Sequence, residues 1–301
     1  MNKASARSVR DGLTAWGFSA PYLLLLTVFG LIPAGYAIYE SLSPAVSYTG
    51  ESHGSVGLSN YRTVFHDFRF WPAVGNVGLF MVIWVPVMVV GSLLFALLLH
   101  EKVGRFSGVM RLIYFLPGAV TGSAAVLLWY FMLDPQLSPF RSQLKSMGYK
   151  TGNDVFTAGH LAPIFALIAF TTGVGQWIVI MFGALQSVPN DVIEAARIDG
   201  AGSVRIALLI KLPLVSKYIT YMIILCFAAA LQIFVEPTLF YSITNAGSNW
   251  WSLNQLGYSY AFQQGQFGQA ATISVVLLVV SSVAALIFVR RSSFFDTEVD
   301  S

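Results

Sequence analysis

The sequence predicts an all-α integral membrane protein with about six transmembrane helices. Hydrophobic residues make up 56% of the 301 residues and charged residues 10%, and the mean hydropathy is +0.68. Apolar runs of about 18 or more residues are long enough to cross the hydrocarbon core as helices. The runs do not favour a transmembrane barrel, because barrel strands alternate apolar and polar positions and these runs do not. The predicted spans are residues 16–42, 74–99, 112–133, 161–185, 218–240 and 270–289.

The first span resembles a signal peptide, because basic residues precede its apolar run. The run, however, continues through Pro33 to residue 42, and no small-residue cleavage site precedes a polar segment. We therefore expect an uncleaved first helix. Residues 1–70 are predicted to comprise a cytoplasmic N-terminus, this helix and an outer loop.

The other five spans are predicted to form a core over residues 71–291, followed by a cytoplasmic tail, residues 292–301. The third span contains Pro117, Gly118 and Gly122. Membrane helices tolerate such residues where neighbouring helices or a water-filled cavity satisfy the freed backbone groups. Small residues also let helices approach closely. Close packing is favoured here over a specific gating role.

The distribution of cations predicts the orientation in the membrane. The six apolar cores contain no Lys or Arg, and 12 of the 17 cations fall in segments on the same side as both termini. The positive-inside rule then places both termini in the cytoplasm of a multi-pass protein of the inner (cytoplasmic) cell membrane.

Residues 187–217 form a long cytoplasmic loop with a helical pattern of its own. Pro189 stops the fourth span. Asp191 can cap a new helix, with Glu194 completing a capping box three residues later. Gly200 suits the left-handed turn that ends this helix.

A second helix is expected to begin near Ser203. Its apolar residues Ile206, Leu209 and Ile210 would share one face, with Arg205 and Lys211 off that face.

Two roles are open for this loop. A short rigid helix can dock into a groove of another protein, or it can lie in the bilayer interface. The acidic residues Glu194 and Asp199 favour docking, because anionic lipids repel carboxylates.

The loop resembles the EAA loop of importer permeases in the ATP-binding-cassette class. The match holds at every fixed position over twenty residues, and it lies between the fourth and fifth of six spans, where that family carries it. Asp199-Gly200-Ala201, Pro189-Asn190 and Asn60-Tyr61 are similar to the sugar-permease branch, related to maltose and glycerol-phosphate uptake systems. The matched coupling residues are Glu194, Ala195, Ala196, Asp199, Gly200, Ile210, Leu212 and Pro213.

The resemblance implies a type I ABC importer permease fold and a coupling helix that seats in a cleft of an ATPase subunit. The chain would bind no cofactor and would not be an enzyme, and ATP and Mg would be bound by two partner ATPase subunits. The absence of a Gly-x-x-x-x-Gly-Lys-Ser/Thr phosphate loop agrees with this expectation. The other implied partners are an extracytoplasmic solute-binding protein and a second permease chain, with a heterodimer favoured and a homodimer left open.

Polar residues within the spans are candidates for the solute pathway, namely Gln176, Trp177, Gln232 and Glu236. Gln232 and Glu236 are one helical turn apart and are expected on one face of the fifth span. Aromatic and amide groups suit a sugar, whose ring stacks while its hydroxyls form hydrogen bonds. Hydrogen bonding between helices explains each residue equally well, and Glu236 can alternatively face water at the outer end.

A neutral sugar or oligosaccharide is the first choice of solute, because the spans lack cations that would meet an anion. A glycerol-phosphate or polyol importer stays open, since a second permease could supply those cations. An ion-coupled secondary transporter would favour an inverted repeat and ionisable residues at the bilayer midplane, which the sequence lacks. A membrane enzyme would need a catalytic cluster, which is also absent. The four histidines have no metal-ligand spacing, so we expect solvated surface histidines and no metal site.

Overall fold

The computed structural model describes residues 16–46, 52–53, 57–101, 104–120 and 122–291. The N-terminal residues 1–15, Lys102 and the predicted tail 292–301 lie outside the described residues. The chain divides into two compact units, one comprising residues 1–67 and 257–276 and the other residues 68–256 and 277–301. Residues 257–276 thus belong to the same unit as the N-terminal segment, and the sequence-based division at residue 70 stays a prediction.

Five helices of the described chain are long and apolar enough to cross a membrane, and a bent helix pair brings the number to six if it counts as one span. The third span, predicted as one helix over 112–133, is instead two helices bent by 99°. The five long helices are Trp16–Leu42, Phe70–Glu101, Leu161–Gln186, Ser216–Thr244 and Phe267–Arg290, and the bent pair is Arg105–Ala119 with Ser123–Leu133.

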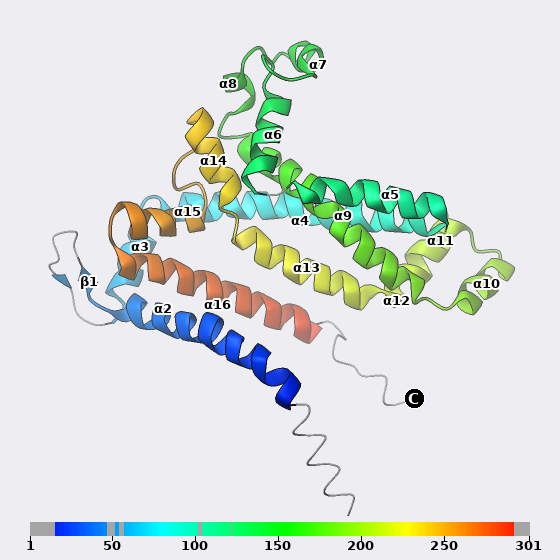
Figure 1. The fold of residues 1–301 in the computed structure, drawn as a ribbon, viewed down its shortest axis with the longest axis horizontal. Helices are drawn as coiled ribbons and strands as arrows, with labels where there is room; N and C mark the ends of the chain where they lie inside the picture. The colour runs from blue at the N-terminus through cyan, green and yellow to red at the C-terminus, as the bar shows by residue number, and fades with distance from the viewer. Residues whose placement is uncertain (1–15, 47–51, 54–56, 102–103, 121, 292–301) are drawn as a thin grey trace, which may run out of the picture. The chain divides into compact units, whose positions relative to one another are not determined.

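The core of the larger unit is built on α4 (Phe70–Glu101) and α9 (Leu161–Gln186), which pack along each other (Figure 1). α5 (Arg105–Phe115) and α13 (Ser216–Leu231) pack against this pair. Buried residues recur every three or four positions along α4, as expected when one face of a helix packs against the core. Its buried members include Ala73, Val77, Phe80, Trp84 and Met88, whereas Val82, Val90 and Leu94 are exposed, as suits a lipid-facing stripe.

The bend in the third span has a local cause. A 3₁₀ turn, η2 (Leu116–Ala119), separates α5 from α6 (Ser123–Leu133). Pro117 cannot donate a backbone hydrogen bond to a continuing helix, and Gly122 adopts a φ of +58°. A Cβ at Gly118 would lie 2.9 Å from the carbonyl oxygen of Thr172, so this turn packs closely against α9.

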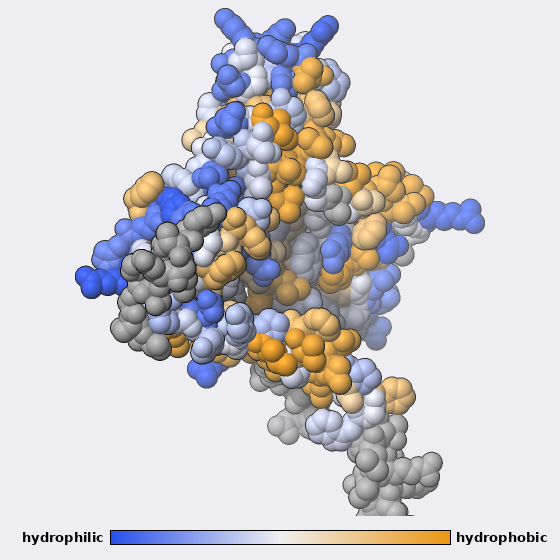
Figure 2. Space-filling view, turned by 60° about the vertical axis from the view of Figure 1, so that its left-hand side comes forward, coloured by the Kyte–Doolittle hydropathy of each residue, from blue (hydrophilic) through white to orange (hydrophobic). Residues whose placement is uncertain are grey.

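The loop before α9 contains two short helices, α7 (Arg141–Ser146) and α8 (Gly152–Val155). Figure 2 shows hydrophilic residues gathered at the tip that α7 and α8 form. The Asp154 carboxylate accepts hydrogen bonds from the backbone N–H groups of Thr151 and Lys150, both at 2.8 Å. These bonds, with Thr151 contributing most, hold the pKa of Asp154 below its ordinary value and close a capping box at the start of α8.

In the smaller unit, Asn60 and Tyr61 form hydrogen bonds with the end of the first span. The first span includes η1 (Thr27–Leu31) and α2 (Ile32–Leu42), and it is followed by an antiparallel pair of β1 (Ala45–Val46) and β2 (Ser52–His53) and by α3 (Ser59–His66). The buried Asn60 amide donates hydrogen bonds to the carbonyl oxygens of Ser41 (3.1 Å) and Ser43 (2.8 Å), and the hydroxyls of Tyr61 and Ser41 lie 3.0 Å apart. These hydrogen bonds therefore lie at the end of the first span.

The C-terminal part of the described chain contains α15 (Leu253–Tyr258), η4 (Ser259–Gln263) and α16 (Phe267–Arg291).

Candidate functional site

The predicted cytoplasmic loop begins with a short helix, α10 (Asn190–Ile198). Pro189 is its N-cap residue, with φ −61° and ψ 132°, and no side chain forms a cap hydrogen bond. The predicted capping box of Asp191 and Glu194 is therefore wrong. Asp191 lies two positions further inside the helix than expected, because Pro189 already supplies the extended residue from which the helix starts. Its carboxylate still faces the positive end of the helix dipole.

Gly200 ends α10 as the sequence predicts. Its φ is +81°, its N–H donates to the carbonyl of Arg197 at 3.0 Å, and the N–H of Ala201 donates to the carbonyl of Ala196 at 2.9 Å. These two bonds form a Schellman motif, which satisfies the last carbonyls of the helix. A residue with a Cβ would be strained in this backbone conformation by about 1 kcal/mol.

α10 exposes most of its side chains. Only Ile193 is buried, whereas Glu194 is exposed and the apolar side chains of Val192 and Ile198 are 43% and 86% exposed. Apolar side chains exposed on a short helix can serve as contacts for a groove of another protein. Of the other predicted coupling residues, Ala195, Asp199, Gly200 and Pro213 are exposed, and Ala196, Ile210 and Leu212 are half-buried.

The second helix of the loop begins at Ser203, as predicted, but its faces differ from the prediction. It passes from α11 (Ser203–Ile206) through a π-helical turn, η3 (Ala207–Lys211), into α12 (Leu212–Leu214). A π-helical turn contains about one residue more than an α-helical turn. Lys211, five residues after Ile206, therefore lies on the same side of the helix as Ile206. Ile206 and Lys211 are both 2% exposed, whereas Leu209 is 64% exposed. The predicted apolar face, with Lys211 off it, is therefore wrong.

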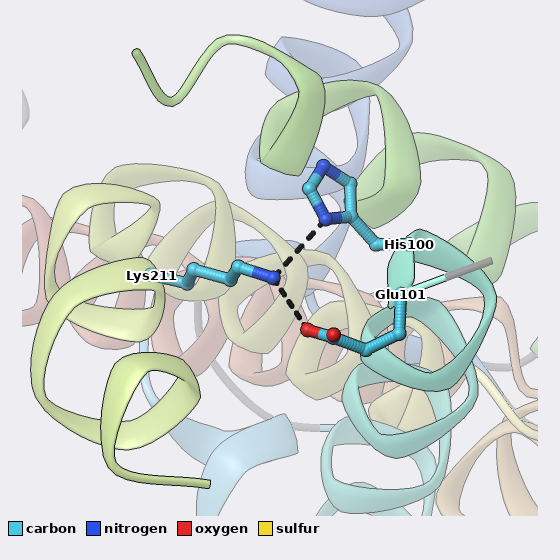
Figure 3. Close-up of polar contacts among 3 residues, drawn as sticks. All are labelled: His100, Glu101 and Lys211. Atoms are coloured by element: carbon cyan, nitrogen blue, oxygen red, sulfur yellow. Dashed lines mark hydrogen bonds and ion pairs between the residues drawn. The ribbon is translucent and has the colours of Figure 1, made fainter. Parts of the chain in front are cut away.

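Lys211 is held by two residues at the end of α4 (Figure 3). Its ammonium nitrogen Nζ lies 2.8 Å from Oε1 of Glu101 and 3.2 Å from Nδ1 of His100. An ammonium group can only donate, so His100 accepts at Nδ1 and is neutral. The His100 ring also packs edge-on against Phe182 of α9, with ring centroids 5.9 Å apart. His100, expected to be a solvated surface histidine, is instead part of this contact.

These side chains line a depression of about 410 Å³ along α10. Sequence patterns do not indicate that His100 and Glu101 belong to it, because more than one hundred residues separate them from Lys211. The one sequence signal is an adjacent histidine and glutamate directly at the end of a long apolar run. The residues that line the depression are His100, Glu101, Gln186, Val188, Asn190, Ile193, Glu194, Arg197 and Lys211.

The fifth span, counted above as one over Ser216–Thr244, contains a short interruption where the sequence predicts a continuous helix. α13 ends at Leu231, and α14 (Val235–Thr244) begins after Phe234, whose φ and ψ are −145° and −48°. The expectation that Gln232 and Glu236 share a face of an unbroken helix is therefore wrong. Interrupted membrane helices leave backbone groups free and are typical of solute sites in transporters.

Gln232 and Glu236 nevertheless line one cavity of about 290 Å³ at this break. Trp84 of α4 also lines it, stacked on Phe80 with ring centroids 5.4 Å apart. The Trp84 indole is 7% exposed, and its N–H has no hydrogen-bond partner among the described residues. Sequence reasoning missed Trp84, since an indole in an apolar run carries no distinguishing signal. The full lining is Phe80, Trp84, Ala169, Thr172, Ala229, Gln232, Ile233, Phe234, Val235 and Glu236.

The structure does not bring the other two predicted pathway residues to this cavity. Gln176 is exposed on α9, and Trp177 packs against Tyr221 of α13 with ring centroids 6.3 Å apart. In the part of the chain that the structure describes, no three His, Cys, Asp or Glu side chains are grouped to hold a metal ion.

Comparison with known proteins places the chain among transport permeases. Residues 68–293 match the family model described as the binding-protein-dependent transport system inner membrane component. The chain is 26% identical to the multiple sugar-binding transport system permease protein MsmF of Streptococcus mutans, over 96% of this chain and 99% of that protein. It is 32% identical to the sn-glycerol-3-phosphate transport system permease protein UgpA of Yersinia enterocolitica, over 69% of this chain and 72% of that protein.

The fold is also that of a solved importer. A chain of a bacterial alginate ABC transporter, crystallised with an alginate pentasaccharide-bound periplasmic protein, superposes with a TM-score of 0.77 at 16% identity, covering 94% of each chain. The matched family model covers five of the six spans and the whole loop that carries α10. The chain therefore belongs to the family of binding-protein-dependent transport system inner membrane components.

Proposed function

We propose that this chain is the transmembrane permease subunit of an ATP-driven importer that takes a sugar or oligosaccharide from an extracytoplasmic solute-binding protein. The observation that carries the proposal is α10. It is a short helix closed by a Schellman turn, it lies between the fourth and fifth spans, and it exposes Glu194 and the apolar Ile198.

The family and the loop support a set of partners. α10 would seat in a cleft of an ATPase subunit, and two such subunits would bind ATP and Mg, because this sequence has no phosphate-binding loop of its own. A second permease chain would complete the translocation pathway. The positive-inside distribution supports a location in the cytoplasmic membrane with both termini inside the cell.

ATP can drive import only if it favours one conformation of the complex over the other. In the proposed cycle, ATP binding moves the ATPase subunits together, and α10 moves with them. The cavity beside the broken fifth span would then change its access from the cytoplasm to the outside.

The cavity chemistry supports a neutral hydroxylated solute. An amide, an indole N–H and a threonine hydroxyl can hydrogen-bond to hydroxyl groups, and the aromatic walls can stack on a sugar ring. The lining has no Lys or Arg that could pair with a phosphate. The similarity to UgpA keeps glycerol phosphate as the second candidate.

Reconstitution tests the function directly. The complex with its second permease and ATPase subunits is placed in lipid vesicles, and uptake is measured with the solute-binding protein outside and ATP inside. We expect uptake that requires both ATP and the binding protein. Uptake that follows an ion gradient without ATP would instead identify a secondary transporter.

Changing Gln232 to Leu tests the proposed pathway. The substitution removes one hydrogen-bonding group from the cavity, and we expect transport to fall roughly tenfold, as for loss of about 1.4 kcal/mol of solute interaction. The measurement is the uptake rate at saturating binding protein. Gln143→Leu, on the exposed face of α7, is the matched control and should transport normally. Equal rates for the two variants would remove Gln232 from the pathway.

A further inference from the structure

Lys211 joins the coupling loop to a helix that is not its neighbour in the chain. The loop is covalently continuous with α9 before it and with α13 after it. Among the described residues, the partners of the Lys211 ammonium group are Glu101 and His100, and both belong to α4. The contact therefore attaches the loop to a third helix.

The burial of Lys211 makes this attachment specific. Its side chain is 3% exposed, whereas that of Glu101 is 36% exposed. A buried ammonium group is tolerated only when it is paired and hydrogen-bonded. Separating Lys211 from α4 would leave a cation without compensation, so the geometry favours movement of loop and helix together.

α4 connects the Lys211 contact with the cavity at the broken fifth span. Glu101 and Trp84 lie on the same helix, 17 residues apart, which is a rise of roughly 26 Å. Trp84 and Phe80 line the cavity at the broken fifth span. α4 is also fixed to α13 between these points, where the Ser92 hydroxyl lies 3.2 Å from Sδ of Met222.

We propose that Lys211 is a positioning residue that fastens the coupling loop to α4 through Glu101 and His100, so that a displacement of α10 reaches the cavity wall at Trp84. This proposal rests on the proposed importer function. The contact stays closed throughout the transport cycle, and it acts on the ratio of solute moved to ATP hydrolysed. Lys211 itself touches neither solute nor nucleotide.

The decisive variant is Lys211→Met, which keeps the length of the side chain and removes its charge. In the reconstituted complex, ATP hydrolysis and solute uptake are measured on the same vesicles. We expect uptake to fall about tenfold while hydrolysis stays within roughly twofold of the wild type, as for an interaction that serves coupling alone. A merely structural role would reduce both rates together and leave their ratio unchanged.

Arg205→Met is the matched control. It removes a cation from the same loop, six residues away, at an exposed position. Its ratio of uptake to hydrolysis should equal that of the wild type. An unchanged ratio for assembled Lys211→Met, with normal uptake, would overturn the proposal.

A double variant with exchanged charges keeps the proposal testable if Lys211→Met fails to fold. If Lys211→Met does not assemble, the double variant Lys211→Glu with Glu101→Lys decides, because it restores an ion pair at the same place. Recovery of coupled uptake supports the fastening role, and an assembled double variant without recovery overturns it.

Cross-linking tests whether the contact stays closed. In a Cys226→Ala background, which removes the chain's single cysteine, Glu101→Cys and Lys211→Cys are joined by a short bifunctional thiol reagent. The double variant lacks the ion pair, so its uptake before cross-linking is expected to be low. Uptake that rises when the cross-link restores the attachment supports the proposal, and uptake that the cross-link blocks overturns it.

The two proposals fail in distinguishable ways. A wild-type complex without ATP-dependent uptake contradicts the importer function. A wild-type complex that transports normally, alongside a Lys211→Met complex with the same coupling ratio, contradicts only the role of Lys211.

Discussion

Replacing Gly200 with aspartate is expected to reduce solute uptake at least tenfold while leaving the protein in the membrane. Gly200 has a φ of +81°, and its N–H and that of Ala201 close α10. An L-residue in this conformation costs about 1 kcal/mol, and relief of that strain would open the Schellman turn and redirect α10. The measurement is ATP-dependent uptake in vesicles, together with co-purification of the ATPase subunit.

Gly202→Asp is the matched control for this variant. Gly202 has an ordinary φ of −72°, and a Cβ at either glycine would meet no atom within 4 Å. Both variants add one negative charge to the same turn. Gly202 is the N-cap residue of α11, a position that favours aspartate, so the strained backbone is found only at Gly200. Gly202→Asp should transport normally. Normal uptake and normal ATPase co-purification by Gly200→Asp would contradict the docking role of α10.

Replacing Gly175 with alanine is expected to destabilise the folded protein by about 3 kcal/mol, near the upper end for overpacking. A Cβ at Gly175 would overlap the carbonyl oxygen of Tyr114 and lie 2.6 Å from Cα of Phe115. Both atoms belong to the backbone of α5, which cannot move aside as a flexible side chain can. The whole crossing of α5 and α9 would have to widen.

Thermal unfolding in detergent measures this effect, and Gly183→Ala provides the comparison. Gly183 lies on the same helix, and a Cβ there meets nothing within 4 Å. Alanine at that position should be neutral or slightly stabilising, because it has the higher helix propensity. Equal Tm values for the two variants would mean that α5 and α9 are not in contact at Gly175.

Local patterns were sufficient to predict the spans and the turn of the coupling loop. Long apolar runs predict membrane helices because length and composition alone decide whether a segment can cross a bilayer. Gly200 could be predicted as the end of α10 because only glycine adopts its conformation without strain. Pro117 and Gly118 were recognised as residues that can interrupt a helix, but the bend was not predicted, because it depends on the packing against Thr172.

The remaining features depend on partners distant in sequence. The π turn changes the side to which Lys211 points, and no periodic pattern anticipates an added residue within one turn. Lys211 was therefore predicted to lie off the buried face, although Glu101 and His100 compensate its charge there. The break after Leu231 was missed because residues 218–240 are apolar enough, as a whole, to form one membrane helix.

The length of α4 has a consequence for the membrane itself. Its 32 residues correspond to roughly 48 Å, whereas the hydrocarbon layer is about 30 Å thick. Such positive hydrophobic mismatch is accommodated by tilting or by projection beyond the acyl chains. If its other end is held near the opposite surface, the last turns of α4 extend into the headgroup region. The ion pair between Glu101 and the buried Lys211 then lies at the depth of the lipid headgroups, outside the hydrocarbon layer.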